Sequence, residues 1–507
     1  MIPSVHREPP AVARESGILR GRKWSIVGLL AAVVTSYLWF IATHCSPYAG
    51  PSDASGYLNA ARLLEEGNLI QPIPRIEGLD TQIWDPHQQR PLGFHVDSEA
   101  ATMTPSYPVG FPLHLWLASQ VVGLDLATIP VNLMLVLAGA ALMLAVGRRL
   151  GLSRSWALAA VGMLWACPLF LSYSLQPMSD MPATVWVLAS IWCALKTRER
   201  WTWGFAAGAS IAMSVLIRPT NLVVLLPVAT VIGFRWRGWL AVVAGGIPGA
   251  AVLAWYNTTL YGSVSSTGYG SVGHLFRLEH VPHNAAHFAL WIFLLLSPVV
   301  AVGALALLAT KRRPPLLLPL VIAWVTGFVG VYVFYYHAGE TWWYLRFILP
   351  AFPALILAAC VALQGFTERL PRGMKLGCWV ALTGVALAWE LTLARRLRID
   401  LARVGDEVYV QTAEWMKANA PANALVMQMQ ASGAFTYYTD FTIVRWDILT
   451  DEKSWPALQR AARAAGRPIY ATLFEFEEER ALQQSIPGNW ERMERIDRVT
   501  IWRLVPD

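Results

Sequence analysis

The sequence predicts an α-helical, multi-pass membrane protein with a small α/β domain after the last membrane span. Three observations lead to this prediction. Apolar residues make up 55% of the 507 residues and charged residues only 14%, with a mean hydropathy of +0.42, whereas about 25% of the residues in soluble globular proteins are charged. Long apolar runs recur up to residue 394, and beyond it the composition becomes that of a soluble domain.

The same composition excludes several other classes. Five cysteines form too few disulfides to stabilise a chain of this length, so a disulfide scaffold is not predicted. Cys167, Cys193, Cys360 and Cys378 lie inside apolar runs and Cys45 lies at the edge of one, and we interpret all five as unpaired packing residues. The net charge of +7 comes from basic residues in short clumps between the apolar runs, so no nucleic-acid partner is predicted.

Eleven apolar runs are candidates for membrane spans, because about 20 apolar residues cross the bilayer core. They lie near residues 24–44, 127–146, 156–173, 181–195, 203–217, 219–234, 239–257, 288–309, 316–336, 347–366 and 376–394. The first run lacks the cleavage site of a secretory signal, so we expect it to remain as an anchor. The runs predict three regions: a cytoplasmic tail at 1–23, a transmembrane domain at 24–394 and a soluble extracytoplasmic domain at 395–507.

The basic clumps predict the orientation of the spans, since short cytoplasmic loops are enriched in Lys and Arg. With the N-terminus inside, the cytoplasmic segments contain 19 Lys and Arg, and the outer loops before residue 395 contain 6. This count requires the apolar stretch 111–123, which His114 and Gln120 interrupt, to lie along the outer membrane interface instead of crossing it. Residues 45–126 then form one outer loop, with nine acidic residues and three arginines.

The last region contains 15 basic and 16 acidic residues, and helical patterns alternate there with strand-like ones. Residues 406–420 and 455–465 have the apolar spacing of helices. Residues 424–429, 468–474 and 499–504 have patterns typical of strands. A small α/β domain is therefore expected, and the sequence contains no internal repeat of fixed period.

The first outer loop carries two candidates for chemistry. Asp53, in Ser52-Asp-Ala-Ser-Gly-Tyr57, is expected at the N-cap or in the first turn of the helix that follows. Its carboxylate either caps that helix or acts as a general base at the membrane surface. Farther along, Tyr107 lies among three prolines in residues 104–112. Either the prolines only make the backbone rigid before the next helix, or Tyr107 helps to shape the substrate site.

Three charged residues lie at the outer ends of later spans. Asp180 has no basic neighbour in sequence, and removing a lone carboxylate from water is costly, so it either caps the next span or belongs to a site. Arg218 and Arg346 lie on the side where the charge pattern disfavours them. Each either extends to the lipid headgroups or binds a phosphate through paired hydrogen bonds.

The outer loop 258–287 carries the four histidines His274, His280, His283 and His287. Their spacing matches no recognised set of metal ligands, and no cysteine accompanies them. The sequence therefore does not predict a metal site in this loop.

Taken in order, these features resemble the GT-C superfamily of integral-membrane glycosyltransferases, specifically the bacterial relatives of protein O-mannosyltransferases and of lipid A aminoarabinose transferases. The resemblance covers about residues 24 to 366. The matching residues are Asp53 and Tyr57 ahead of an Ala-rich helix ending in Glu-Gly, Tyr107-Pro-Val-Gly-Phe-Pro112, Asp180 after the third span, and Arg346-Phe-Ile-Leu-Pro350. The family also has membrane-parallel helices in its first outer loop, in agreement with the orientation derived from charge.

The resemblance implies transfer of a sugar from a polyprenyl-phosphate carrier to an acceptor at the outer face of the bacterial inner membrane, with inversion at the anomeric carbon. Asp53 would take the proton of the acceptor hydroxyl. Arg346, with Arg218, would neutralise the phosphate that gains charge as the sugar leaves. Asp180 would orient hydroxyl groups or assist a divalent metal. The donor sugar and the acceptor, which is a lipid, a glycan or a protein, stay undefined.

The sequence departs from the family at two positions. Ala54 stands where many relatives have a second carboxylate, so a two-acid metal site is not predicted in the first loop. Tyr107 stands where the aminoarabinose transferases have a lysine. We expect Tyr107 and Tyr57 to contact the substrate, without the phosphate contact of that lysine.

Two other functions stay open at this point. A secondary transporter or flippase would have inverted repeats and ionisable groups near the midplane, and Glu390 is the only acid well inside an apolar run. A glycan polymerase or ligase would share the outer polar site but would use a diphosphate-linked donor.

Overall fold

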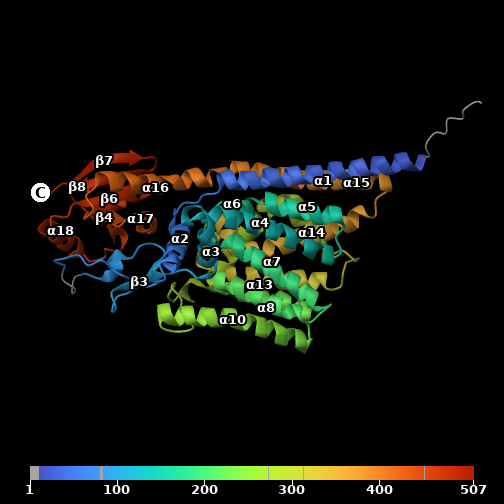
Figure 1. Cartoon of the computed structure of the whole chain (residues 1–507), viewed down its shortest axis with the longest axis horizontal. Coiled ribbons are helices and arrows are strands. Elements are labelled where there is room, and N and C mark those ends of the chain that lie inside the picture. The colour runs from blue at the N-terminus through green and yellow to red at the C-terminus, as the bar shows by residue number, and fades with distance from the viewer. Residues whose placement is uncertain (1–10, 80–83, 272, 312, 450, 507) are drawn as a thin grey trace, which may run out of the picture.

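The computed structural model describes residues 11–79, 84–271, 273–311, 313–449 and 451–506. Figure 1 shows an elongated molecule in which a bundle of helices is joined, at one end, to the first loop and the C-terminal strands and helices. The predicted fold class is confirmed, since a multi-pass helical region is followed by a small α/β region. The first ten residues of the expected tail lie outside the described residues, and the first helix begins at Ala11.

Each of the eleven apolar runs lies in one helix or in two consecutive helices. The first six correspond to α1 (Ala11–His44), α4 (Leu124–Arg149), α5 with α6 (Arg154–Ala166 and Pro168–Ser174), α7 (Asp180–Thr197), α8 (Trp203–Ile217), and η2 with α9 (Pro219–Val224 and Leu225–Ile232). The last five correspond to α10 (Trp236–Tyr261), α11 with α12 (Val281–Leu295 and Ser297–Ala306), α13 (Leu317–Tyr332), η6 with α14 (Trp342–Ala351 and Phe352–Thr367), and α15 (Arg372–Arg396).

The expected spans are not all straight helices. Within the described residues, five helices are long and apolar enough to cross a membrane, or up to seven when each of two bent pairs counts as one span. The bends measure 64° between α5 and α6 and 115° between α11 and α12. Pro168 and Pro298 lie just after these breaks, and a proline has no amide hydrogen with which to continue a helix.

The outer surface of the bundle is apolar, as expected where helices contact lipid. On α1 the side chains of Val33 and Trp39 are exposed, and on α10 those of Leu240 and Trp255 are exposed. In contrast, α14 is buried along most of its length and belongs to the largest hydrophobic core. Exposed apolar side chains over whole helices favour a membrane environment.

The loop between α1 and α4, called the first loop below, folds into two helices and a small antiparallel sheet. The helices are α2 (Ser52–Glu65) and α3 (Gly110–Val122), and the strands are β1 (Gln71–Pro72), β2 (Phe94–Asp97) and β3 (Thr102–Pro105), in the order β1-β3-β2. The helix expected at 111–123 is α3. The sequence does not predict the strands, because segments of two to four residues are too short to show an alternating pattern.

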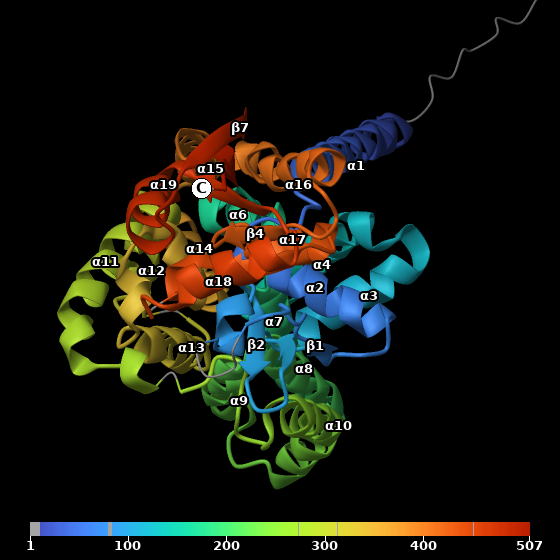
Figure 2. The same ribbon diagram turned by 90° about the vertical axis from the view of Figure 1, so that its left-hand side faces the viewer.

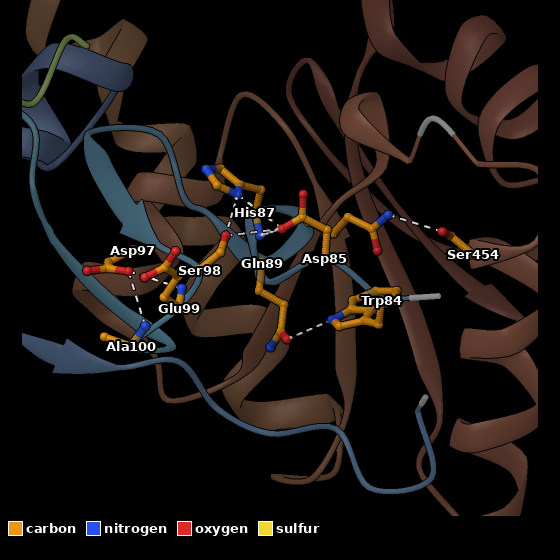
Figure 3. Close-up of polar contacts among 10 residues, drawn as sticks. Trp84, Asp85, His87, Gln89, Asp97, Ser98, Glu99, Ala100 and Ser454 are labelled. Carbon is orange, nitrogen blue, oxygen red and sulfur yellow. Dashed lines mark hydrogen bonds and ion pairs between the residues drawn. The ribbon is translucent and has the colours of Figure 1, made fainter. Parts of the chain in front are cut away.

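Asp85, His87 and Ser98 form a polar cluster in this loop (Figure 3). Asp85 Oδ1 lies 3.0 Å from His87 Nδ1, and Ser98 Oγ lies 2.7 Å from the same nitrogen. A nucleophilic serine would instead contact Nε2, because the acid orients the ring through Nδ1. The cluster therefore fixes the loop, and the neighbouring Gln88 Nε2 donates to Ser454 Oγ of the C-terminal region at 3.1 Å.

The C-terminal region is a five-stranded sheet with helices on it. Its elements are α16 (Ala402–Asn419), β4 (Leu425–Gln428), α17 (Ser432–Tyr438), β5 (Thr442–Arg445), α18 (Ser454–Ala464), β6 (Ile469–Phe474), α19 (Glu475–Arg480), β7 (Trp490–Ile496) and β8 (Val499–Leu504). The strand order is β5-β4-β6-β8-β7, with β4 parallel to β5 and β6, and β8 antiparallel to β6 and β7. The two helices and three strands expected here are present, and β5 and β7 are additional.

Short single-turn elements complete the chain. They are η1 (Pro86–Gln89), η3 (Gly273–Leu275), η4 (Leu278–His280), η5 (Tyr336–Gly339), η7 (Ile399–Leu401), η8 (Trp446–Ile448) and the π-turn η9 (Ala481–Ser485).

The C-terminal region packs on the first loop through α17 and α2, which lie close together in Figure 2. Asn59 Nδ2 on α2 donates to the carbonyl of Gly433 on α17 at 2.8 Å. A Cβ added at Gly433 would lie 2.3 Å from Ser55 Oγ, so only glycine permits this close approach. The two regions together hold α2, which begins at the site described below.

Candidate active site

The helix α2 presents Asp53 and Tyr57 to a shared cavity. They are four residues apart and therefore lie on the same face of the helix, one turn apart. Pro51 precedes the helix and Asp53 lies in its first turn, as the sequence predicts. The opposite side of α2 carries Ser55 and Asn59, which contact α17. The contact with α17 thus fixes the direction in which Asp53 points.

Tyr107 lies directly on the backbone of α2. A Cβ added at Gly56 would lie 2.2 Å from Cε2 of the Tyr107 ring, so the glycine is what allows the ring to approach. The Tyr107 hydroxyl donates a 2.5 Å hydrogen bond to Oδ1 of Asp53. Two tyrosines of α10 fix the backbone of residues 105–107. Tyr256 donates to the carbonyl of Tyr107 at 3.0 Å, and Tyr261 donates to that of Pro105 at 2.7 Å.

Arg346, in η6, forms an ion pair with the other oxygen of the Asp53 carboxylate. Its Nη1 lies 2.6 Å from Asp53 Oδ2, and the two side chains are 15% and 24% exposed. The guanidinium also lies over the rings of Phe347 and Tyr344, with its carbon 5.1 and 5.7 Å from their centroids. Cation–π contacts and the ion pair together fix the arginine at the cavity wall.

A second ion pair joins Asp180 and Arg218. Arg218 Nη2 lies 2.7 Å from Asp180 Oδ1, and the Asp180 side chain is completely buried at the start of α7. Ser179 links this pair to α2, because its Oγ accepts hydrogen bonds from Arg218 Nε at 3.0 Å and from the Tyr57 hydroxyl at 2.7 Å. The two ion pairs are therefore both connected to α2, one through Asp53 and the other through Ser179 and Tyr57.

The cavity between these groups has a volume of about 310 Å³. Five of the six site residues expected from the sequence line it, namely Asp53, Tyr57, Tyr107, Arg218 and Arg346. Asp180 does not line it and lies behind Arg218. The remaining lining residues are not among those expected from the sequence, and they are Pro108, Pro219, Thr220, Thr267, Tyr269, Phe276, Tyr332, Tyr335 and Phe347.

A sequence signal exists for some of these additional residues. Tyr332 and Tyr335 lie at one end of an apolar run, where aromatic residues often mark the membrane interface. Tyr332 also stacks on Phe347, with ring centroids 5.0 Å apart, and its hydroxyl lies 2.6 Å from Thr220 Oγ1. Tyr269 comes from the loop after α10, which is rich in glycine, serine and tyrosine.

The Asp53 carboxyl is ionised at neutral pH. Burial raises its pKa, but the Arg346 guanidinium and the Tyr107 hydroxyl outweigh that effect, so the pKa lies below its usual value. Burial and the adjacent Asp53 charge raise the pKa of Tyr107 well above its usual value, so this hydroxyl keeps its proton. The site thus presents a carboxylate acceptor next to a tyrosine donor.

The site does not have the composition of a metal centre. Among the described residues, no group of three or more His, Cys, Asp or Glu side chains is placed to hold a metal ion. Asp53 and Asp180 each face an arginine, and a divalent cation would have to approach against that positive charge. Two of the four histidines expected in the loop 258–287 lie in α11 instead, where His283 Nε2 is 3.0 Å from the carbonyl oxygen of Gly339 and His287 Nε2 is 3.1 Å from that of Thr341.

Solved membrane enzymes share this architecture. ArnT from Cupriavidus metallidurans, solved bound to undecaprenyl phosphate, superposes with a TM-score of 0.56 at 14% identity, over 95% of this chain and 98% of the other. Arabinofuranosyltransferase AftD from Mycobacteria matches with a TM-score of 0.55 at 14% identity, over 96% of this chain and 40% of the other. The Archaeoglobus fulgidus oligosaccharyltransferase matches with a TM-score of 0.50 at 12% identity, over 88% and 69%.

No family model matches the sequence, and neither does a curated protein. The likeness is therefore one of structure, and it extends along nearly the whole chain for ArnT. The chain therefore has the fold that ArnT, AftD and the oligosaccharyltransferase share, in agreement with the fold that the resemblance in the sequence implies.

Proposed function

We propose that this protein transfers a sugar from a polyprenyl-phosphate-linked donor to an acceptor at the outer face of a bacterial inner membrane, with inversion at the anomeric carbon. One observation carries the proposal: a carboxylate, Asp53, and two guanidinium groups, Arg346 and Arg218, line the same cavity. This is the set of groups that the reaction needs. The structure of ArnT with undecaprenyl phosphate supports a lipid-phosphate donor by analogy of fold.

The proposed reaction is an in-line displacement at the anomeric carbon. The acceptor oxygen bonds to that carbon as the bond from the carbon to the phosphate oxygen breaks, and Asp53 receives the proton of the acceptor hydroxyl. The polyprenyl phosphate leaves with the bonding electron pair, and its growing negative charge is stabilised by Arg346 and Arg218. No redox step and no further reactant are required.

In this mechanism, donor binding activates the base. Before the donor binds, Arg346 contacts the Asp53 carboxylate at 2.6 Å, which lowers the pKa of Asp53. A phosphate that engages Arg346 competes for the guanidinium and adds negative charge beside Asp53. Both effects raise the pKa of Asp53 and make it a stronger base while the acceptor is bound.

We assign Asp180 a positioning role in place of the direct contact with substrate expected from the sequence. It is fully buried and does not line the cavity, but it holds Arg218 at 2.7 Å. Arg218 in turn reaches the cavity wall. Loss of Asp180 would leave Arg218 free to change its position and would remove one of the two phosphate contacts in this proposal.

The proposed orientation places the cavity at the outer leaflet and the C-terminal region in the periplasm. The first loop, which carries the site, precedes α4, and Arg148 and Arg149 lie at the opposite end of that helix. Basic residues at the far end agree with a cytoplasmic location for that end. Nucleotide sugars are confined to the cytoplasm, so an enzyme working on the outer side needs a lipid-linked donor.

The test is sugar transfer by purified protein in proteoliposomes supplied with undecaprenyl-monophosphate-linked sugars. We expect Asp53→Asn to lower the rate about 10²- to 10⁴-fold, which is the contribution typical of a general base. Glu99→Gln, which removes an exposed acid of the same loop, should leave the rate unchanged. Wild-type turnover by Asp53→Asn would remove this residue from the mechanism, and consumption of a diphosphate-linked donor alone would favour a polymerase or ligase.

A further inference from the structure

A second pocket lies between the C-terminal region and the segment that enters α2. It has a volume of about 310 Å³ and is lined by Pro51, Tyr409, Gln430, Phe474, Glu475, Phe476 and Arg498. We call it the C-domain pocket. Pro51 lies two residues before Asp53, so the first turn of α2 is near both this pocket and the candidate active site.

The C-domain pocket combines a buried aromatic floor with an exposed aromatic wall. Tyr409 and Phe474 are 2% and 3% exposed, and their ring centroids are 5.3 Å apart. Phe476 is 68% exposed, with its ring 5.7 Å from that of Phe474. Aromatic rings beside a few polar groups are common in ligand sites.

The polar groups of this pocket are held in place by neighbouring residues. Gln430 Nε2 donates to the Tyr409 hydroxyl at 3.1 Å. Glu477, which is 1% exposed, accepts from the backbone N–H of Gln430 at 3.1 Å and from that of Phe474 at 2.8 Å. Arg498 donates to the carbonyl of Gly405 at 2.6 Å and lies over the Phe474 ring. The pocket is therefore formed before any ligand binds.

We propose that the C-domain pocket binds the saccharide part of the acceptor substrate. Sugar hydroxyl groups both donate and accept hydrogen bonds, and the pocket offers a guanidinium at Arg498, an amide at Gln430 and a carboxylate at Glu475, which also forms an ion pair with Arg495. The apolar face of a sugar ring fits against the exposed ring of Phe476. The assignment rests on the proposed function, because a sugar pocket beside Asp53 holds an acceptor only if sugar transfer occurs there.

The position of the pocket in the sheet favours a saccharide over a peptide. Extended peptides commonly bind by adding a strand to a sheet edge. The edges of this sheet are β5 and β7, whereas the pocket lies where β6 ends, at the register pair Phe474 and Val499 of two inner strands. Strand addition is therefore not available at this pocket.

The proposal is tested by binding of the full-length protein in detergent to an array of envelope-type di- to tetrasaccharides. We expect wild-type protein to be retained, and Phe476→Ala to weaken binding about tenfold because the stacking surface is lost. Glu475→Gln should weaken binding less. Met493→Ala, which removes another exposed apolar side chain of the same region, should bind as wild type does. Unchanged unfolding temperatures verify that the variants are folded.

Several outcomes would overturn the proposal: no retention of wild-type protein on any glycan, equal retention of Phe476→Ala, or retention only on a parallel peptide array. The proposed function fails separately. If wild-type protein binds glycans through Phe476 but consumes no polyprenyl-phosphate-linked sugar, the pocket stands as a saccharide site and the transferase assignment is wrong.

Discussion

Two partners, Arg346 and Tyr107, hold the Asp53 carboxylate in place. The Arg346 ion pair at 2.6 Å and the Tyr107 hydrogen bond at 2.5 Å both favour the ionised carboxylate. Partly buried ion pairs gain little stability, since desolvation offsets much of the attraction between the charges. In the proposed mechanism, these contacts keep the Asp53 base ionised and oriented until the donor phosphate engages Arg346.

Removal of the Tyr107 hydroxyl should change the pH dependence of transfer. Since that hydroxyl lowers the pKa of Asp53, Tyr107→Phe raises it, and the acidic limb of kcat/KM should move to higher pH. Initial rates measured from about pH 3 to about pH 8 give this limb. Tyr261→Phe is the matched control, because its hydroxyl bonds to the carbonyl of Pro105 instead of Asp53. If wild type and Tyr107→Phe have the same acidic limb in kcat/KM, the Tyr107 hydroxyl does not affect the pKa of Asp53.

At the scale of elements, the site depends on close packing between α2 and the segment that follows β3. The Tyr107 ring packs against the backbone of Gly56. Gly93, with φ +88°, also contacts this glycine, and a Cβ added at Gly93 would lie 2.7 Å from Gly56 Cα. Helix propensity alone would favour alanine at Gly56 by about 1 kcal/mol. The packing therefore opposes the local preference of the helix.

Gly56→Ala should consequently lower both stability and transfer activity, because the new methyl group displaces Tyr107 from Asp53. Gly377→Ala, within α15, provides the control, since no heavy atom lies within 4 Å of its added Cβ. Thermal unfolding in detergent and transfer assays on both variants give the comparison. A Gly56→Ala protein that is as stable and active as Gly377→Ala would show that the ring does not need this approach.

The sequence predicts long apolar helices well and short strands poorly. Every apolar run corresponds to helix, and β8 has the bounds expected from its pattern. In contrast, β7 (Trp490–Ile496) consists mostly of exposed charged residues and carries no apolar alternation. Charge counting groups Asp53, Arg218 and Arg346 on one side of the membrane, but it gives no pairing, so the Asp53–Arg346 contact and the burial of Asp180 emerge only from the fold.

At the scale of the whole molecule, Asp406 links the C-terminal region to the chain just before α2. Ser46 Oγ donates to Asp406 Oδ2 at 2.7 Å, and a Cβ added at Gly50 would lie 2.9 Å from the Asp406 carboxyl carbon. Burial raises the pKa of Asp406 to about 6, although the Ser46 hydrogen bond opposes this effect. The folded state therefore binds the Asp406 proton more tightly than the unfolded state does.

This raised pKa predicts that Asp406→Asn increases the stability of the folded protein by an amount that depends on pH. The stability that wild type draws from the protonated carboxyl is complete below the unfolded pKa and is lost as pH rises through about 6. The amide stays neutral, so the variant should gain stability over wild type by at most about 3 kcal/mol at about pH 8, and by about half as much at about pH 5. Unfolding temperatures at both pH values test this, with the exposed Asp400→Asn as control. An equal difference at both pH values would contradict it.

The central claim is that the cavity between Asp53, Arg218 and Arg346 receives a lipid-linked phosphate. A cryo-EM structure of the full-length protein in a nanodisc containing undecaprenyl phosphate tests it most directly. We expect the phosphate to contact Arg346 within the cavity, with the Asp53–Arg346 distance longer than the present 2.6 Å and the lipid chain entering from the outer leaflet. Phosphate bound elsewhere, or at the opposite ends of the helices near Arg148 and Arg149, would contradict the account.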